Sequence, residues 1–277
     1  MPMSDTAARA ADSLDNPDWL KLLARVGFGA KGVVYVVLGA LAAQGVVRGG
    51  TEGALTEIGQ QPFGKVLLGL VAVGLVAYAL WRLAQATLDP EGEGNDAKAI
   101  GKRVGWACSG LVYVGLAWTA LDIVTGGSGG GGSGGSGGGA QDWTAKLLAL
   151  EFGRWVVGLV GVGILLGGAH QLRQAVTAGF RENFALHEMS AVERRWAERA
   201  GRLGHAARAV LYAIVGFFLL QAAWTSNAEQ AGGLGEALRT LREQPYGPWL
   251  LSAAGVGLVC YGLYCFVMAR YRKAVVL

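Results

Sequence analysis

Three kinds of polar residue recur at fixed spacing inside apolar sequence, and their side chains could bind an anion or a small polar solute. Each residue of the first copy has an equivalent 78 residues later and another 177 residues later, both counted from the first copy. The set comprises Arg25, Arg103 and Arg202, then Tyr35, Tyr113 and Tyr212, and finally Gln44, Asp122 and Gln221. Around a common axis these residues would form a basic mouth, a phenolic ring about 15 Å deeper, and an amide and carboxylate exit, which suits a narrow path for an anion or a small solute.

Each of these rings also has a purely structural interpretation. Arginines at the ends of membrane spans anchor helices against anionic lipid headgroups. A tyrosine in the middle of a span can satisfy its hydroxyl group against a neighbouring helix. Asp122 lies about 28 Å along its helix from Arg103, near water, where a carboxylate is easily kept charged. The repeated residues alone leave both interpretations open.

Two histidines offer a different chemistry. His170 and His205 are expected at a similar depth, with glycines beside them that would leave room for a macrocycle, so a bis-histidine haem is a remote alternative. Phe28 and Trp106 replace His205 in the other copies of its segment, which favours an aromatic packing role. We therefore expect no cofactor.

The remaining motifs do not predict catalysis. Gly59 to Lys65 has the spacing of a phosphate-binding loop, but Val66 follows where Ser or Thr is needed and no strand precedes it, so we interpret it as a helix start. The cysteines lie inside apolar runs and show neither metal-ligand spacing nor a disulfide framework; they are Cys108, Cys260 and Cys265. We expect no metal site, no enzyme and no nucleic-acid partner.

Six apolar runs must position these residues. Hydrophobic residues make up 52% of the 277 and charged residues only 16%, which is too apolar for an ordinary soluble domain. Each run is about 21–24 residues long, or about 31–36 Å as a helix, enough to cross a hydrocarbon core of roughly 30 Å. The expected spans are about 26–47, 63–86, 104–124, 153–176, 205–225 and 247–269.

The spans form three copies of one unit. A tail with an interfacial helix (1–24) precedes repeats at 25–99, 100–187 and 188–277. Each repeat consists of a span, a short helical piece and a second span; the pieces are expected at Gly53–Ile58, Thr144–Leu150 and Leu234–Leu241. Because two spans restore the starting side, all three repeats are parallel, and we predict a pseudo-threefold arrangement about the membrane normal.

The loops set the orientation. Lys and Arg are more frequent in the termini and in the second and fourth loops than in the alternate loops, so the positive-inside rule predicts that both termini are cytoplasmic. Residues 188–202 are expected to form a charged cytoplasmic helix that starts with a capping box of Ser190 and Glu193. The run 126–139 contains only Gly and Ser and is expected to be a flexible coil, natural or engineered.

Small residues recur at equivalent positions of the spans, where they would let helix backbones approach. They stand seven residues apart in the first span of each repeat and ten residues into the second. The expected packing positions are Gly32, Gly110 and Ala209, then Gly39, Ala117 and Gly216, and finally Gly74, Gly163 and Gly257.

The triplicate opening Arg-x-Gly-x-x-x-(basic or small)-small-aliphatic-aliphatic-Tyr resembles the bacterial domain-of-unknown-function family 1206, whose members have three tandem two-helix repeats. The resemblance covers about residues 20–272. Repeat two departs from it, because Leu150-Glu151-Phe152-Gly153 lacks the Gln-Pro of the other copies. The resemblance implies an all-α integral protein of the bacterial inner membrane, and it implies no biochemical activity.

We therefore predict a non-enzymatic multi-pass membrane protein that packs with lipids, with anionic headgroups, and with membrane partner subunits or further copies of itself. The alternative is a channel or transporter for an anion or small solute along the pseudo-threefold axis. A haem-containing redox subunit is the remote third hypothesis.

Overall fold

The computed structural model describes residues 18–45, 50–88, 96–126 and 139–272. In these ranges the regular secondary structure is helical, apart from one isolated β-bridge between Phe184 and Arg272. Six long helices carry the fold: α2 (Asp18–Ala43), α4 (Gly64–Leu88), α5 (Ala97–Thr125), α7 (Gly153–Thr177), α8 (Ala191–Thr225) and α10 (Gly247–Tyr271). The N-terminal tail and most of the Gly/Ser run lie outside the described residues.

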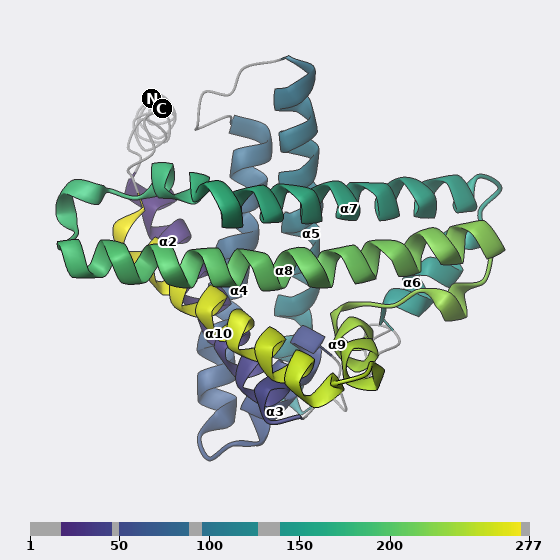
Figure 1. The fold of residues 1–277 in the computed structure, drawn as a ribbon, viewed down its shortest axis with the longest axis horizontal. Helices are drawn as coiled ribbons and strands as arrows, with labels where there is room; N and C mark the ends of the chain where they lie inside the picture. The colour runs from purple at the N-terminus through teal and green to yellow at the C-terminus, as the bar shows by residue number, and fades with distance from the viewer. Residues whose placement is uncertain (1–17, 46–49, 89–95, 127–138, 273–277) are drawn as a thin grey trace, which may run out of the picture.

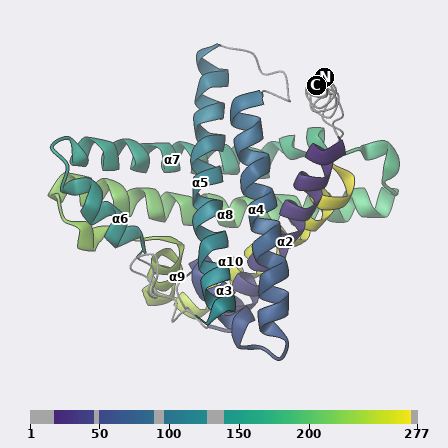
Figure 2. The same ribbon diagram turned by 180° about the vertical axis from the view of Figure 1, so that it is seen from behind.

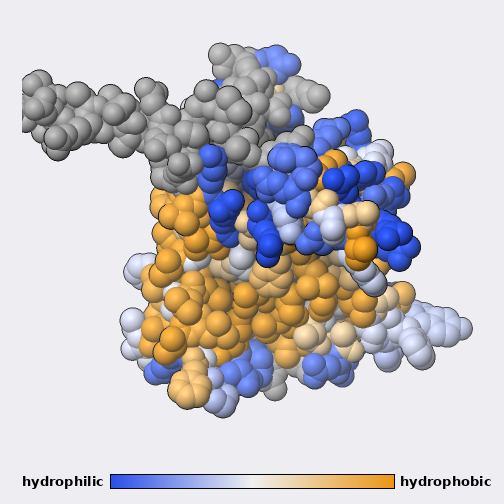
Figure 3. Space-filling model, turned by 90° about the vertical axis from the view of Figure 1, so that its left-hand side faces the viewer, coloured by the Kyte–Doolittle hydropathy of each residue, from blue (hydrophilic) through white to orange (hydrophobic). Residues whose placement is uncertain are grey.

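All six long helices have the length and apolarity of membrane spans. Figure 3 shows a broad apolar band on one face of the molecule, with hydrophilic side chains gathered above and below it. The expected all-α, six-span membrane architecture is confirmed. The expected interfacial segment before the first span is continuous with it, because α2 runs without a break from Asp18 to Ala43.

In each repeat one short helix lies between the two spans. The three short helices lie at the same end of the bundle, which we call the distal end. They are α3 (Gly50–Gln60), α6 (Gly139–Leu148) and α9 (Leu234–Glu243). The opposite end, where α2, α5 and α8 begin, is the proximal end. Here two 3-10 turns, η1 (Gly179–Asn183) and η2 (Leu186–Glu188), connect α7 to α8, whereas η3 (Ala228–Gln230) precedes α9 at the distal end.

A glycine begins the second span of every repeat for a steric reason. A Cβ atom on Gly64 would lie 2.1 Å from the Ile58 carbonyl oxygen, and one on Gly247 would lie 1.9 Å from the Arg242 carbonyl oxygen. The turn that delivers the chain to these helices places Phe63 and Tyr246 at positive φ, 60° and 62°. The repeated aromatic-Gly pair is therefore a helix start, as the sequence predicts.

The charged helix expected at 188–202 begins at Ala191 and forms the first part of the 35-residue helix α8 (Ala191–Thr225), with Ser190 as its N-cap. The Ser190 hydroxyl accepts from the Glu193 amide, and the Glu193 carboxylate accepts from the Ser190 amide, so the predicted capping box is confirmed. At 1.5 Å per residue α8 is about 52 Å long, and about 20 Å of it extends beyond a hydrocarbon core of roughly 30 Å.

The spans pack head to tail around a pseudo-threefold axis. The second helix of each repeat packs along the first helix of the next, which pairs α4 with α5, α7 with α8, and α10 with α2. Figure 1 shows the first two pairs crossing each other steeply, with α2 and α10 running diagonally between them, and Figure 2 shows the same order from behind.

The ring is open at one place. Within repeats 1 and 3 the two spans also pack on each other, α2 on α4 and α8 on α10, whereas α5 and α7 of repeat 2 do not pack along one another. The most apolar window is 28% buried in α5 and 17% buried in α7, the two lowest values of the six spans. We call the unpacked surfaces of α5 and α7 the repeat-2 seam.

Candidate functional site

A lysine lies in the middle of the bundle inside a cage of aromatic rings. Lys31, on α2, is only 3% exposed, and its Nζ donates a 2.9 Å hydrogen bond to the Tyr78 hydroxyl of α4. Cation–π contacts of this kind contribute about 2 kcal/mol when they are desolvated. The Nζ atom lies 4.6–6.0 Å from the ring centroids of Tyr78, Tyr113, Tyr261, Phe28 and Tyr35.

Two arginines extend this positive centre. Arg82 Nε donates a 2.9 Å hydrogen bond to the same Tyr78 hydroxyl, and its Nη1 donates to Gln85. Arg208 of α8 is 7% exposed, and its Nη2 donates to the Tyr212 hydroxyl one helical turn away. Its Cζ lies 4.3 Å from the ring centroid of Tyr261, a cation–π contact.

The cation–tyrosine cluster, as we name it, therefore draws on α2, α4, α5, α8 and α10. It comprises Lys31, Arg82, Arg208, Tyr35, Tyr78, Tyr113, Tyr212 and Tyr261.

Among the described residues, no acid pairs with the three cations of the cluster. In the described ranges the ion pairs join other residues, and none includes Lys31, Arg82 or Arg208. A single Lys or Arg at the centre of a spanning helix costs about 2.5–3.5 kcal/mol. Aromatic faces and phenolic oxygens offset part of this cost, but they leave the net charge in place. Among the described side chains, the buried Nε of Arg208 also has no hydrogen-bond partner.

The three repeats contribute unequally to the cluster. Lys31 and Arg208 occupy equivalent positions in repeats 1 and 3, and Ser109 stands there in repeat 2. On the second helix Tyr78 and Tyr261 are equivalent, and Gly167 stands there in repeat 2. Repeat 2 thus contributes Tyr113 to the cluster, but it supplies neither the cation nor the second-helix tyrosine of the other repeats, on the side of the open seam.

The repeated tyrosines predicted as a mid-membrane ring surround these cations. Tyr35 is 7% and Tyr113 9% exposed, and Tyr212 is half-buried. Tyr35 packs edge to face against Tyr261 at 4.9 Å between centroids, and Tyr113 packs likewise against Tyr78 at 4.5 Å.

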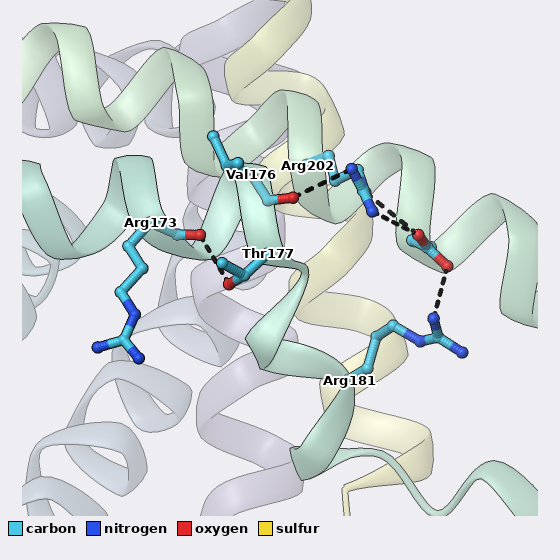
Figure 4. A network of polar contacts seen from close by, with 6 residues as sticks. Arg173, Val176, Thr177, Arg181 and Arg202 are labelled. Atoms are coloured by element: carbon cyan, nitrogen blue, oxygen red, sulfur yellow. Dashed lines mark hydrogen bonds and ion pairs between the residues drawn. The ribbon is translucent and has the colours of Figure 1, made fainter.

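The repeated arginines lie at the proximal end, outside the cluster. Arg25 and Arg202 are exposed and Arg103 is half-buried. Arg202 forms a 3.0 Å ion pair with Glu198 and donates to the Val176 carbonyl oxygen, while Glu198 also pairs with Arg181 (Figure 4). Arg202 therefore ties α7 to α8.

The predicted outer ring is not gathered into a buried site either. Gln44 and Gln221 are exposed, and Asp122 is half-buried near the end of α5.

His205 packs as an aromatic residue. It is 5% exposed, stacks on Phe180 at 5.0 Å, and places its Nδ1 2.8 Å from the Gly201 carbonyl oxygen. It meets Tyr261 edge to face, as Phe28 meets Tyr78 in repeat 1. His170 is exposed and contacts Gln174 instead.

Most of the predicted packing residues lie at helix crossings. A Cβ on Gly32 or Gly39 would clash with α10, one on Gly110 would meet Leu83 of α4, and one on Gly216 would clash with Leu165 of α7.

The expectation that Gly163 packs like its equivalents needs correction. A Cβ on Gly74 would lie 2.3 Å from Ala30, and one on Gly257 2.4 Å from Ala207, whereas Gly163 has nothing within 4 Å. The reason is that α5, whose Cys108 is the equivalent of these alanines, does not pack on α7, and Cys108 is exposed.

The cations of the cluster were not predicted from the sequence. The signal was present, because the repeated motif allows a basic residue four positions before its tyrosine, and that position is Lys31 in one copy and Arg208 in another. Ser109 in the middle copy hides the pattern. Arg82 has no basic equivalent, since Gln171 and Cys265 replace it.

The fold and the cluster define a class, an all-helical six-span membrane protein built from three repeats. Comparison with known families matches residues 26–89, 104–178 and 203–272 to the family described as Domain of Unknown Function (DUF1206). The chain belongs to this family. It is also similar to the "Uncharacterized protein YxxB" of Bacillus subtilis (strain 168), with 34% identity over 259 residues and 92% of each chain covered. No solved structure matches the chain.

Proposed function

We propose that this protein binds a small anionic group inside the membrane at the cation–tyrosine cluster and acts as a carrier for it. The observation that carries the proposal is that the buried Lys31 and Arg208 and the half-buried Arg82 contact phenolic hydroxyls, and that no acid among the described residues pairs with them. In a medium of low dielectric constant an anion would be attracted far more strongly than in water. The unpartnered Nε of Arg208 offers it a donor.

A carrier suits this geometry better than an open pore. The side chains of the cluster fill the region where the helices meet, and Tyr78 and Trp81 of α4 are fully buried there. An anion would therefore have to displace or reorient aromatic rings, and carriers bind and release a solute in such alternating steps.

Thermal unfolding of the purified protein in detergent tests the proposal. At constant ionic strength, acetate or phosphate is expected to raise the unfolding temperature relative to gluconate, because a ligand at a hundred times its Kd adds about 2.7 kcal/mol of stability. Arg208→Met should abolish this increase, and Arg208→Lys should retain part of it. Equal stabilisation in the wild type and in Arg208→Met would contradict the proposal.

The matched control is Arg154→Met. Arg154 also lies over an aromatic ring, 5.1 Å from the Trp155 centroid, but it is exposed at the distal end. This variant should keep the full response to the anion.

A second candidate function is the one the sequence favours, packing with lipids or membrane partner subunits. It is supported by an apolar stripe on the proximal part of α8, where Val192, Trp196 and Leu203 are 54%, 66% and 56% exposed. Trp196→Glu should release a partner from the protein purified with its membrane complexes, and an unchanged set of co-purified proteins would count against this candidate.

For the location we propose the bacterial inner membrane with both termini in the cytoplasm, on the excess of basic residues in the proximal loops. A green fluorescent protein fused to the C-terminus should then fluoresce, whereas a periplasmic phosphatase fused there should be inactive. The reverse pattern would overturn this orientation.

A further inference from the structure

We propose that the repeat-2 seam is a lateral entrance through which a single-chain fatty-acid anion reaches the cation–tyrosine cluster, with its carboxylate at Lys31 and Arg208 and its acyl chain between α5 and α7. The inference rests on the proposed function and adds its substrate class.

The helix surfaces at the repeat-2 seam are unpacked, unlike the equivalent surfaces of repeats 1 and 3. In repeats 1 and 3 a glycine of the first span meets a tyrosine of the second: a Cβ on Gly27 would lie 2.6 Å from Tyr78, and one on Gly204 2.6 Å from Tyr261. The equivalent Gly105 has nothing within 4 Å and is exposed. The surfaces that close two repeats are thus free in the third.

Both helices of the seam reach residues of the cation–tyrosine cluster. On α5, Tyr113 lies one turn beyond Ser109, and its ring centroid is 5.3 Å from Lys31 Nζ. On α7, a Cβ on Gly167 would lie 3.6 Å from the Tyr212 ring, whose hydroxyl accepts from Arg208. Both sides of the seam therefore end at cluster residues. Ser109 and Gly167 occupy the positions that a cation and a tyrosine fill in the other repeats.

The apolar seam and the cations beside it indicate which kind of molecule would bind. An exposed apolar seam beside buried cations that pair with no acid among the described residues fits a molecule with one apolar chain and one anionic end. Lys31 lies six residues beyond Arg25, about 9 Å deeper along the helix. A phospholipid keeps its bulky headgroup at the interface, while a carboxylate is small enough to reach this depth. We therefore assign the site to a fatty-acid anion rather than to a phospholipid.

Photo-crosslinking in lipid nanodiscs tests this assignment. The probes are hexadecanoate with a diazirine in its chain, the corresponding alcohol, and phosphatidylglycerol with the same acyl group. The acid is expected to label peptides of α5 and α7 at least about five-fold more than the alcohol does. The double variant Lys31→Met/Arg208→Met should remove this excess, and Arg154→Met should retain it.

Equal labelling by acid and alcohol, labelling spread evenly over all six spans, or preferred labelling by phosphatidylglycerol would each overturn the inference. A dimer whose contact covers α5 and α7, with no labelling there, would overturn it as well.

A second variant separates the entrance from the binding centre. Gly163→Leu should place an apolar side chain in the seam, because Gly163 is exposed and nothing lies within 4 Å of a Cβ at this position. It is expected to reduce labelling by the acid and to leave stabilisation by acetate unchanged. If acetate still stabilises the protein while labelling is the same in Gly163→Leu and the parent, the entrance is wrong and the anion site stands. If Arg208→Met also leaves the acetate effect unchanged, the proposed function itself fails.

Discussion

Single residues show the break in symmetry most clearly, because the repeats supply their own controls. Gly27, Gly105 and Gly204 are equivalent, but a Cβ added at the first or the last would lie 2.6 Å from a tyrosine Cα, whereas one at Gly105 would have nothing within 4 Å. The sequence makes all three look alike, since each follows the repeated arginine by two residues. Their different surroundings follow from residue 167, where glycine replaces the tyrosines at 78 and 261.

Alanine at these three glycines should therefore give opposite results. Gly27→Ala and Gly204→Ala are expected to destabilise the protein by about 1–3 kcal/mol, because the opposing atoms include backbone that cannot move freely. Gly105→Ala should be neutral or slightly stabilising, since alanine has the better helix propensity. Unfolding of the three variants in detergent would measure this order, and a loss for Gly105→Ala equal to the others would mean that the seam is closed in solution.

Elements were largely predictable because their signals are local. A span needs about 20 apolar residues, and a helix start needs a cap, so the six spans, the short distal helices and the Ser190–Glu193 box could all be predicted. The pairing of elements could not be predicted in the same way. The failure of α5 and α7 to pack depends on what is missing at Ser109 and Gly167, and a missing side chain breaks no periodic pattern.

The start of α8 is held by the capping box of Ser190 and Glu193. Ser190→Ala removes one of the two capping hydrogen bonds, and about 1 kcal/mol of local stability should be lost. Hydrogen exchange of the first turn, residues 191–194, is expected to accelerate, while the half of α8 that packs on α7 stays protected. Glu193 also accepts a 2.7 Å hydrogen bond from Tyr271 of α10, so unchanged exchange in the variant would show that this contact alone holds the helix end.

The whole molecule is a ring of three repeats in which one of the three equivalent within-repeat contacts, the one between α5 and α7, is absent. Repetition explains why the chain brings three arginines to the proximal end and three tyrosines to one depth. It also explains why positive charge gathers at the centre, because Lys31 and Arg208 are the same position copied. The sequence pattern predicted the levels of these residues, but the cations among them became visible only when the helices were packed.

The proposed function requires that the cation–tyrosine cluster holds an anion inside the membrane. Native mass spectrometry of the protein extracted from its own membranes, with no ligand added, measures this directly. We expect one bound anionic species per chain in the wild type and in Arg154→Met, and its loss in Lys31→Met/Arg208→Met. A wild-type chain without a bound species, or the same species at equal occupancy in the double variant, would contradict it.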